Sequence, residues 1–208
     1  MKRGSWGAGE IGAGTVLSVS PRVGSREKNL LDVFLTDVVP GNESLRKIRA
    51  GRYVRAAGRK VGIDITWIDD RIAVGGGIWN ADNMAALSRA GITHIIDMQI
   101  EFDDTPLAVP FRISVCWNPV DDDFEPKPAA VFKRGVDFAL AALKQHGTKV
   151  LVHCAAGVHR APMMTLALLG VLGWTVEDAM EMIENKRPVA DFADVYVQSV
   201  ERFLNGRG

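Results

Sequence analysis

The chain has 208 residues, of which 47% are hydrophobic and 24% charged, and its formal net charge is zero. This balance is typical of one well-packed globular domain with an appendage, and it excludes a disordered chain or two large domains. No apolar run approaches the roughly 20 residues of a membrane span, and nothing resembles a secretory signal, so we expect a cytoplasmic protein.

Charge is unevenly distributed along the chain. Residues 1–60 carry 12 Lys and Arg against 5 Asp and Glu, which gives this part a charge of +7 and residues 61–208 one of −7. We expect a basic extension over residues 1–60, flexible over 1–28, with a basic helix over 44–60. Its charge either is simply solvated or docks an anionic partner, and nucleic acid is not specifically indicated.

Strands and helices alternate along the remaining chain, residues 61–208. Short β-branched and apolar runs predict strands at 63–68, 71–74, 93–100, 111–117 and 149–153. Apolar residues at helical spacing predict helices at 82–91, 129–147, 161–172, from 175 onward, and at 191–204. This order, without any internal repeat, predicts a single α/β domain with a central, mainly parallel sheet of about five strands flanked by helices.

Several ends of these elements carry their own signals. Asp69 and Asp70 mark the turn of a hairpin between the first two strands. Asp82 is expected to cap the first helix and Gly91 to close it, whereas Thr175, followed three residues later by Asp178, has the spacing of a capping box.

The most informative segment joins the last strand to a helix. It reads His153-Cys154-Ala155-Ala156-Gly157-Val158-His159-Arg160. In a tight loop of small residues, successive backbone N–H groups can point inward, and the positive end of the following helix adds to their field. The segment is therefore expected to bind an oxyanion such as phosphate.

Cys154 and Arg160 are the reactive residues of this loop. An ordinary cysteine, with a pKa near ~8.5, is only a few per cent thiolate at neutral pH, but a helix terminus and nearby cations lower that value to roughly 3.5–7.5. Arg160 can fold over the loop and bind two phosphate oxygens with its planar guanidinium group. The alternative, that Cys154 is a buried thiol with a structural role only, does not account for the small-residue loop and for Arg160 at its end.

A cysteine, five residues and an arginine, here Cys154 to Arg160, form a loop that resembles the signature of the protein tyrosine phosphatase superfamily. His153 and Gly157 make it similar to the dual-specificity branch. The resemblance covers residues 62–206 and includes Arg187-Pro188. It implies the fold of that superfamily and a cysteine-dependent phosphatase over 61–208 that needs neither metal nor cofactor.

The resemblance also implies a two-step reaction with a phosphocysteine intermediate and a carboxylic acid that protonates the leaving oxygen. The acid is expected on an upstream loop, where Asp121, Asp122 and Asp123 lie. Comparison with dual-specificity enzymes favours Asp122, with Asp121 as second choice. Clustered carboxylates raise one another's proton affinity, so we expect one of the three to stay protonated.

Three features of the loop leave alternatives open. Residue 161 is alanine where most of the superfamily has a hydroxyl that eases breakdown of the phosphocysteine, although Arg160-Ala161-Pro162 resembles the loop of plant glucan phosphatases. His153 is expected to organise the loop by hydrogen bonds. His159 is either a filler that shapes the loop or a cation near the phosphate.

We therefore expect a phosphatase that hydrolyses phosphate monoesters on phosphotyrosine, phosphoserine or phosphothreonine in proteins, or on a small or polymeric phosphoester. Cys154, Arg160 and Asp122 would be catalytic, residues 155–160 would bind the phosphate, and His153 and Asp121 would support them. The alternatives are a pseudophosphatase that binds phosphate without turnover, a phosphoglucan or phosphoinositide phosphatase, and a sulfurtransferase.

Overall fold

The computed structural model describes residues 62–207. The basic extension predicted over residues 1–60 lies outside the described residues, and so do its expected helix and anionic partner. Among residues 62–207, no helix combines the length and the apolar character that crossing a membrane requires.

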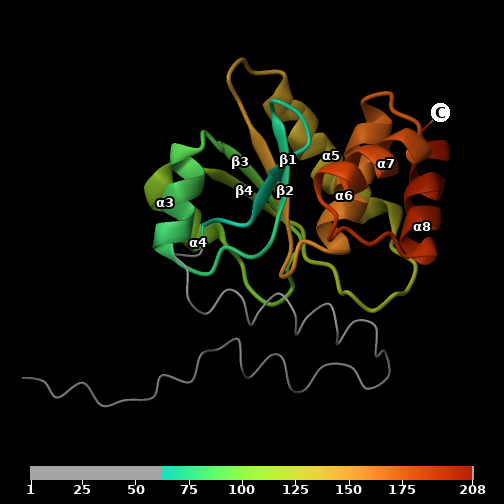
Figure 1. Cartoon of the computed structure of the whole chain (residues 1–208), viewed down its shortest axis with the longest axis horizontal. Coiled ribbons are helices and arrows are strands. Elements are labelled where there is room, and N and C mark those ends of the chain that lie inside the picture. The colour runs from blue at the N-terminus through green and yellow to red at the C-terminus, as the bar shows by residue number, and fades with distance from the viewer. Residues whose placement is uncertain (1–61, 208) are drawn as a thin grey trace, which may run out of the picture. The chain divides into compact units, whose positions relative to one another are not determined.

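Five strands form one mixed sheet in the order β1-β2-β5-β3-β4 (Figure 1). Only β1 runs antiparallel to its neighbour, and the pairs β2-β5, β5-β3 and β3-β4 are parallel. The strands are β1 (Ile65–Trp67), β2 (Ile72–Gly75), β3 (His94–Asp97), β4 (Ser114–Trp117) and β5 (Val150–His153). The predicted mainly parallel sheet of five strands is confirmed.

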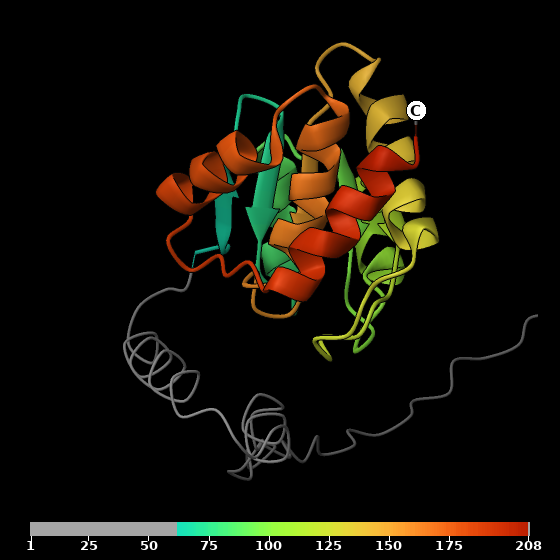
Figure 2. The same ribbon diagram turned by 90° about the vertical axis from the view of Figure 1, so that its right-hand side faces the viewer.

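Helices cover both faces of the sheet, as the two views show (Figure 1, Figure 2). One face carries α3 (Ala81–Arg89) and the short α4 (Thr105–Ala108), which continues into a 3-10 turn, Val109–Phe111. The other face carries α5 (Ala129–Leu143), α6 (Arg160–Val171), α7 (Val176–Lys186) and α8 (Asp194–Asn205). Each face therefore has its own hydrophobic core, which accounts for the buried strands between them.

Helix α6 is the centre of the larger core. Ten consecutive residues from Arg160 to Leu169 are buried, because the helix packs on the sheet and also contacts α5, α7 and α8. This confirms the helix predicted over 161–172, whose nearly continuous apolar sequence indicated burial on most sides. Its first turn, which carries the reactive loop's Arg160, is thereby held in the protein interior.

Some predicted boundaries are corrected. Asn80, and not Asp82, caps α3, because the Asn80 side chain accepts a hydrogen bond from the backbone N–H of Asn83. The strand predicted over 111–117 begins only at Ser114, since residues 105–111 turn helically after Pro106 and again at Pro110. The last helix begins at Asp194, three residues later than predicted.

Other end signals are confirmed. The side chain of Thr175 accepts a hydrogen bond from the backbone N–H of Asp178 at 3.1 Å, so it caps α7. Gly91 follows α3 with φ of 87°, in the left-handed region that favours glycine. The Asp69-Asp70 turn joins β1 to β2.

The parallel strands set the position of the reactive loop. Since β2, β5, β3 and β4 run in the same direction, the segments that follow them emerge at one edge of the sheet. Strand β5 lies between β2 and β3, and the loop from Cys154 to Arg160 follows it directly. The loops after β2, β3 and β4 therefore surround the reactive loop.

Candidate active site

The loop after β5 turns its carbonyl groups outward. The carbonyl oxygen of Ala155 accepts a hydrogen bond from the backbone N–H of Gly77 at 3.1 Å, and that of Val158 accepts one from Asp191 at 2.8 Å. The Arg187 side chain donates to the carbonyl oxygens of Ala156 and Gly157. With these acceptors satisfied from outside, the amides of the loop are free to converge inward, as an anion-binding nest requires.

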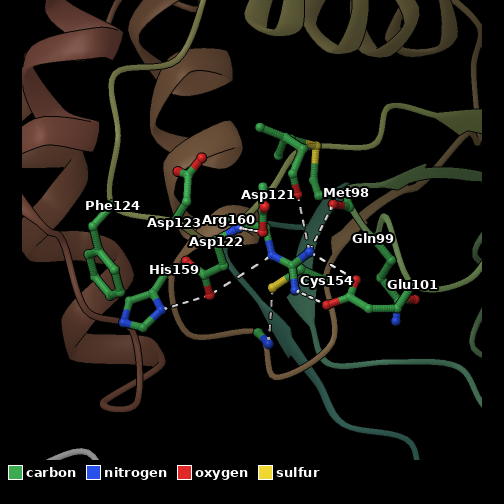
Figure 3. A network of polar contacts seen from close by, with 12 residues as sticks. Met98, Gln99, Glu101, Asp121, Asp122, Asp123, Phe124, Cys154, His159 and Arg160 are labelled. Atoms are coloured by element: carbon green, nitrogen blue, oxygen red, sulfur yellow. Dashed lines mark hydrogen bonds and ion pairs between the residues drawn. The ribbon is translucent and has the colours of Figure 1, made fainter. Parts of the chain in front are cut away.

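Cys154 lies at the centre of this nest and is 1% exposed. The backbone N–H of Gly157 donates to the sulfur of Cys154 at 3.2 Å (Figure 3). Gly157 has φ of 64°, and a Cβ built there would lie 2.6 Å from the carbonyl oxygen of Gly75, so a larger residue would displace this N–H. The sulfur thus lies where the loop directs at least one backbone N–H inward.

Arg160, 3% exposed, is held by a carboxylate that the sequence analysis did not single out. Its two terminal nitrogens donate to the two oxygens of Glu101 at 2.9 and 2.8 Å, in a bidentate pair (Figure 3). Burial would lower the pKa of Arg160, but the bonds and charge of Glu101 raise it, so the cation is permanent. Within the described part of the chain, the Nε of Arg160 has no hydrogen-bond partner and is available for an anion.

Of the three clustered aspartates, Asp122 lies nearest to the guanidinium group. Its Oδ2 lies 3.9 Å from Nε of Arg160 and 3.0 Å from Nδ1 of His159. Asp123 instead pairs with Lys127, and Asp121 is exposed and accepts a hydrogen bond from the backbone of Asp122. The preference for Asp122 over Asp121 is thus supported by geometry and stays a prediction.

The expectation that clustering raises the proton affinity of one of the three aspartates does not hold for Asp122. Burial would raise the pKa of Asp122, but the hydrogen bond and charge of His159, the charge of Arg160 and the hydroxyl of Tyr196 together lower it. The sequence argument counted the neighbouring carboxylates, whereas the fold places cations closer. Asp122 is therefore a carboxylate here until an anion offsets those cations.

Tyr196 on α8 fixes the loop that carries Asp122. Its buried hydroxyl donates to Asp122 at 3.1 Å and accepts from the backbone N–H of Phe124 at 2.9 Å. The Tyr196 ring stacks on Phe124, whose other neighbour is His159 at a centroid distance of 5.1 Å. One buried phenol thus connects the C-terminal helix to the predicted general acid.

His159 bridges two carboxylates and does not merely fill space. Its Nδ1 lies 3.0 Å from Asp122 and its Nε2 lies 3.3 Å from Asp191. Burial alone would lower the pKa of His159, but the hydrogen bonds and charges of Asp122 and Asp191 raise it. The structure thus favours the cation over the filler of the two alternatives.

A second ionisable cluster lies beneath the reactive loop. His153, Asp97 and Asp104 are fully buried, and Nε2 of His153 lies 3.0 Å from Asp104 and 3.5 Å from Asp97. Burial raises the pKa of Asp97 to about 6, although its oxygens accept the backbone N–H groups of Gln99 and Asp104. His153 therefore contacts the loop that carries Glu101 through Asp104, but neither of its ring nitrogens has a hydrogen-bond partner among residues 62–207. Its predicted organisation of the reactive loop by hydrogen bonds stays a prediction.

Among residues 62–207, these three side chains also form a group that could hold a metal ion, because their possible ligand atoms all lie within 4.8 Å of one another. None of them belongs to the inward face of the loop around Cys154. The expectation that the reaction uses no metal stays a prediction.

Cys116 lies on β4, and β3 separates this strand from β5. Two strand spacings amount to about 10 Å, beyond the roughly 7 Å limit for the Cα atoms of a disulfide. A redox partnership with Cys154 is therefore not supported in this arrangement.

Comparison with known proteins identifies the family. The family model "Dual specificity phosphatase, catalytic domain" matches residues 78–203, more than half of the chain. The chain belongs to the dual-specificity phosphatase family. The predicted resemblance to the protein tyrosine phosphatase superfamily is confirmed, and the domain is a phosphatase domain of that superfamily.

Among curated relatives, dual specificity protein phosphatase 5 of Rattus norvegicus is 29% identical over 55% of this chain. Protein phosphatase Slingshot homolog 3 of Rattus norvegicus is 33% identical over 55% of this chain. The matches cover 29% and 17% of those two proteins, so this chain corresponds to less than a third of each.

Solved structures agree on the fold. PTPMT1 in complex with PI(5)P has a TM-score of 0.62 at 21% identity and covers 68% of this chain and 95% of the other. DUSP15 has a TM-score of 0.56 at 27% identity and covers 69% of this chain and 88% of the other. The predicted protein tyrosine phosphatase fold is thereby confirmed.

The His159–Asp122 pair makes the stability of this phosphatase domain depend on pH. Because folding raises the pKa of His159, the pair contributes its full stabilisation at pH values below the ordinary pKa of histidine. This stabilisation is lost as the pH rises through the raised pKa of the folded protein. Because the pKa of Asp122 is lowered, the contribution is also lost as the pH falls through that lowered value. The stabilising window therefore includes about pH 5–6.

We predict that His159→Gln lowers the free energy of unfolding by about 1 kcal/mol near pH 5.5, and by less near about pH 9. Urea unfolding of wild type and variant at both pH values measures the difference. His146→Gln, at an exposed histidine, is the matched control and should have no effect. A loss that is equal at both pH values would contradict the charged pair.

Proposed function

We propose that this domain hydrolyses phosphate monoesters with Cys154 as nucleophile, Arg160 as phosphate ligand and Asp122 as proton donor. The proposal is carried by one observation: the buried sulfur of Cys154 accepts the N–H of Gly157 inside a loop in which the carbonyls of residues 155–158 are bound from outside. Membership of the dual-specificity phosphatase family supports the reaction class.

In the first step the thiolate of Cys154 attacks phosphorus, and the bond from phosphorus to the leaving oxygen breaks. The inward amides of residues 155–160 and the free Nε of Arg160 receive the charge of the transferring phosphoryl group. Glu101 keeps Arg160 in place for this purpose, which makes Glu101 a positioning residue. The product of this step is a phosphocysteine.

Asp122 donates its proton to the leaving oxygen in this step. A bound phosphate dianion offsets the cations of His159 and Arg160 that keep Asp122 ionised, so substrate binding itself favours the protonated acid. In the second step water attacks the phosphorus, Asp122 takes its proton, and the bond to sulfur breaks. Inorganic phosphate and the thiolate are released.

Ala161 bears on the rate of that second step. It is fully buried in the first turn of α6 and offers no hydroxyl beside Cys154. Breakdown of the phosphocysteine is therefore the slow step of the proposed cycle. A pseudophosphatase, which binds phosphate without turnover, is the competing function that this residue favours.

Release of p-nitrophenol from its phosphate ester tests the nucleophile. Cys154→Ser should abolish turnover, because a serine hydroxyl is not ionised in this loop, while the variant still binds inorganic phosphate or vanadate. The matched control is Cys116→Ser, on β4, which should retain activity. Turnover that survives in Cys154→Ser, or a wild type that binds phosphate and releases no product, would refute the proposal.

Two substrates of different leaving group test the proton donor. Asp122→Asn should lower kcat/KM for phenyl phosphate by about 100-fold or more, since phenolate leaves poorly without a proton and kcat/KM reports the first step alone. It should lower kcat/KM for p-nitrophenyl phosphate much less, because p-nitrophenolate leaves unaided. Asp121→Asn is the control and should behave as wild type; the opposite ranking of the two variants would assign the acid to Asp121.

Rapid mixing with p-nitrophenyl phosphate tests the role of Ala161. The wild type should release a burst of about one equivalent of p-nitrophenol before a slower steady state, as expected when the covalent intermediate accumulates. Ala161→Ser should raise the steady-state rate and reduce the burst. If the wild type shows no burst and Ala161→Ser leaves the steady-state rate unchanged, breakdown of the phosphocysteine is not the rate-limiting step.

A further inference from the structure

Four neighbouring loops touch the phosphate-binding loop and form its rim, which we define as residues 76–80, 98–104, 118–128 and 187–193. Each makes a direct contact: Gly77 with Ala155, Glu101 with Arg160, Asp122 with His159, and Asp191 with Val158. The side chains of this rim are what a substrate meets beyond its phosphate group.

The cations of the rim are withdrawn from solvent. Its Lys and Arg residues are Lys127 and Arg187, to which the loop itself adds Arg160. Their side chains are only 4%, 3% and 4% exposed, and they pair with Asp123, Asp64 and Glu101 respectively. None of the three offers a free positive charge to the outer part of a substrate.

The exposed charge of the rim is negative. The exposed carboxylates are Glu101, Asp121, Asp123, Glu125 and Asp191, and Asp103 is half-buried. Three of them, Glu101, Asp123 and Asp191, are engaged by buried cations or by His159, whereas no ion pair within 4.0 Å is found for Asp103, Asp121 or Glu125 among residues 62–207. A cationic group next to the bound phosphate would meet these carboxylates.

Apolar side chains lie between these charges. Large side chains of the rim and of the end of β4 are exposed to between 42% and 48%: Trp79, Ile100, Phe102, Trp117 and Phe124. Phe124 has φ of 59°, an unusual backbone conformation for a bulky residue, and the Tyr196 hydroxyl holds it there. The ring of Phe124 therefore stays exposed on the rim, beside His159, and is not folded into the core.

The loop centre, by contrast, is built for an anion. Arg160 is buried, and its Nε has no hydrogen-bond partner among residues 62–207, so the amides and this nitrogen can receive a single phosphate group. The site thus combines one deep anion position with a negative, partly apolar surround. That combination suits a ligand with one phosphate and cationic or apolar groups around it, and it disfavours a polyanion.

We propose that the rim selects phosphorylated protein segments in which lysine, arginine and apolar residues flank the phosphorylated residue. The proposal rests on the proposed phosphatase function and deepens it, since it names the substrate class. Flanking cations gain attraction from Asp103, Asp121 and Glu125, and flanking apolar groups cover the exposed rings. A phosphoinositide or a densely phosphorylated glucan brings further negative charge toward the same carboxylates.

Matched phosphotyrosine peptides test the selection on the full chain. One peptide carries lysine on both sides of the phosphotyrosine and the other carries glutamate, with identical apolar residues elsewhere. The lysine peptide should have a kcat/KM roughly tenfold higher at about 0.05 M salt, and the ratio should fall toward one at about 1 M salt. PI(5)P in phosphatidylcholine vesicles should be turned over less well than the lysine peptide.

The double variant Asp103→Asn and Glu125→Gln should lose most of this preference. The amide oxygen of the substituted asparagine would replace the carboxylate oxygen that Asp103 offers to the N–H of Thr105, and p-nitrophenyl phosphate turnover should be unchanged. The control, Glu177→Gln with Glu181→Gln, removes the same charge from exposed positions on α7 and should keep the preference. The comparison separates the rim from net charge.

The experiments distinguish failure of the rim proposal from failure of the proposed phosphatase function. If p-nitrophenyl phosphate is hydrolysed but the glutamate peptide or the vesicles are preferred, the rim proposal is overturned and the phosphatase stands. The same holds if the rim variant keeps the preference as fully as the control does. If the wild type hydrolyses none of these substrates, the proposed function falls, and the rim proposal with it.

Discussion

Everything at this site depends on how the carbonyl groups of one loop are bound. The carbonyls of residues 155–158 accept hydrogen bonds from the loop after β2, from Arg187 and from Asp191. These donors come from segments far apart in the sequence, so the loop keeps its shape only within the complete domain. With its acceptors occupied outside, it presents donors inside, and an electronegative group at its centre is stabilised.

A second constraint couples the charged residues around that loop. Arg160 is held by Glu101, Asp122 by His159 and Tyr196, and His153 by Asp104. Arg160 and Asp122 each have a partner of opposite sign, as the burial of a charge requires. Because Glu101 and Asp104 lie on one loop after β3, that loop supports both the phosphate ligand and the strand that carries Cys154.

The sequence predicted the sheet, the main helices and the reactive loop because these depend on local patterns. Residues 150–152 are β-branched or apolar and lie shortly before a run of small residues, and the helix after Arg160 is apolar on nearly all sides. Glu101 and Tyr196 were not predicted, because each lies far along the sequence from the residue that it contacts. Glu101 is 59 residues from Arg160, and Tyr196 is 74 residues from Asp122. The environment of Asp122 was misjudged for the same reason: its sequence neighbours are acidic, but its spatial neighbours are cations.

The negative charge of the rim bears on which phosphoesters this domain would accept. One of these contains PI(5)P, yet at 21% identity it shares with this chain the fold alone. Here the cations near the phosphate-binding loop are paired and buried, so the exposed charge of the rim has the same sign as an anionic lipid. Under the rim proposal, the loops around the anion site determine which substrate is accepted.

The most direct test of the account is the rate at which iodoacetamide alkylates Cys154, in a Cys116→Ser background, with and without vanadate. The account predicts that vanadate, held by the amides around Cys154, protects this thiol from alkylation. Alkylation of Cys154 at the same rate with and without vanadate would contradict the account.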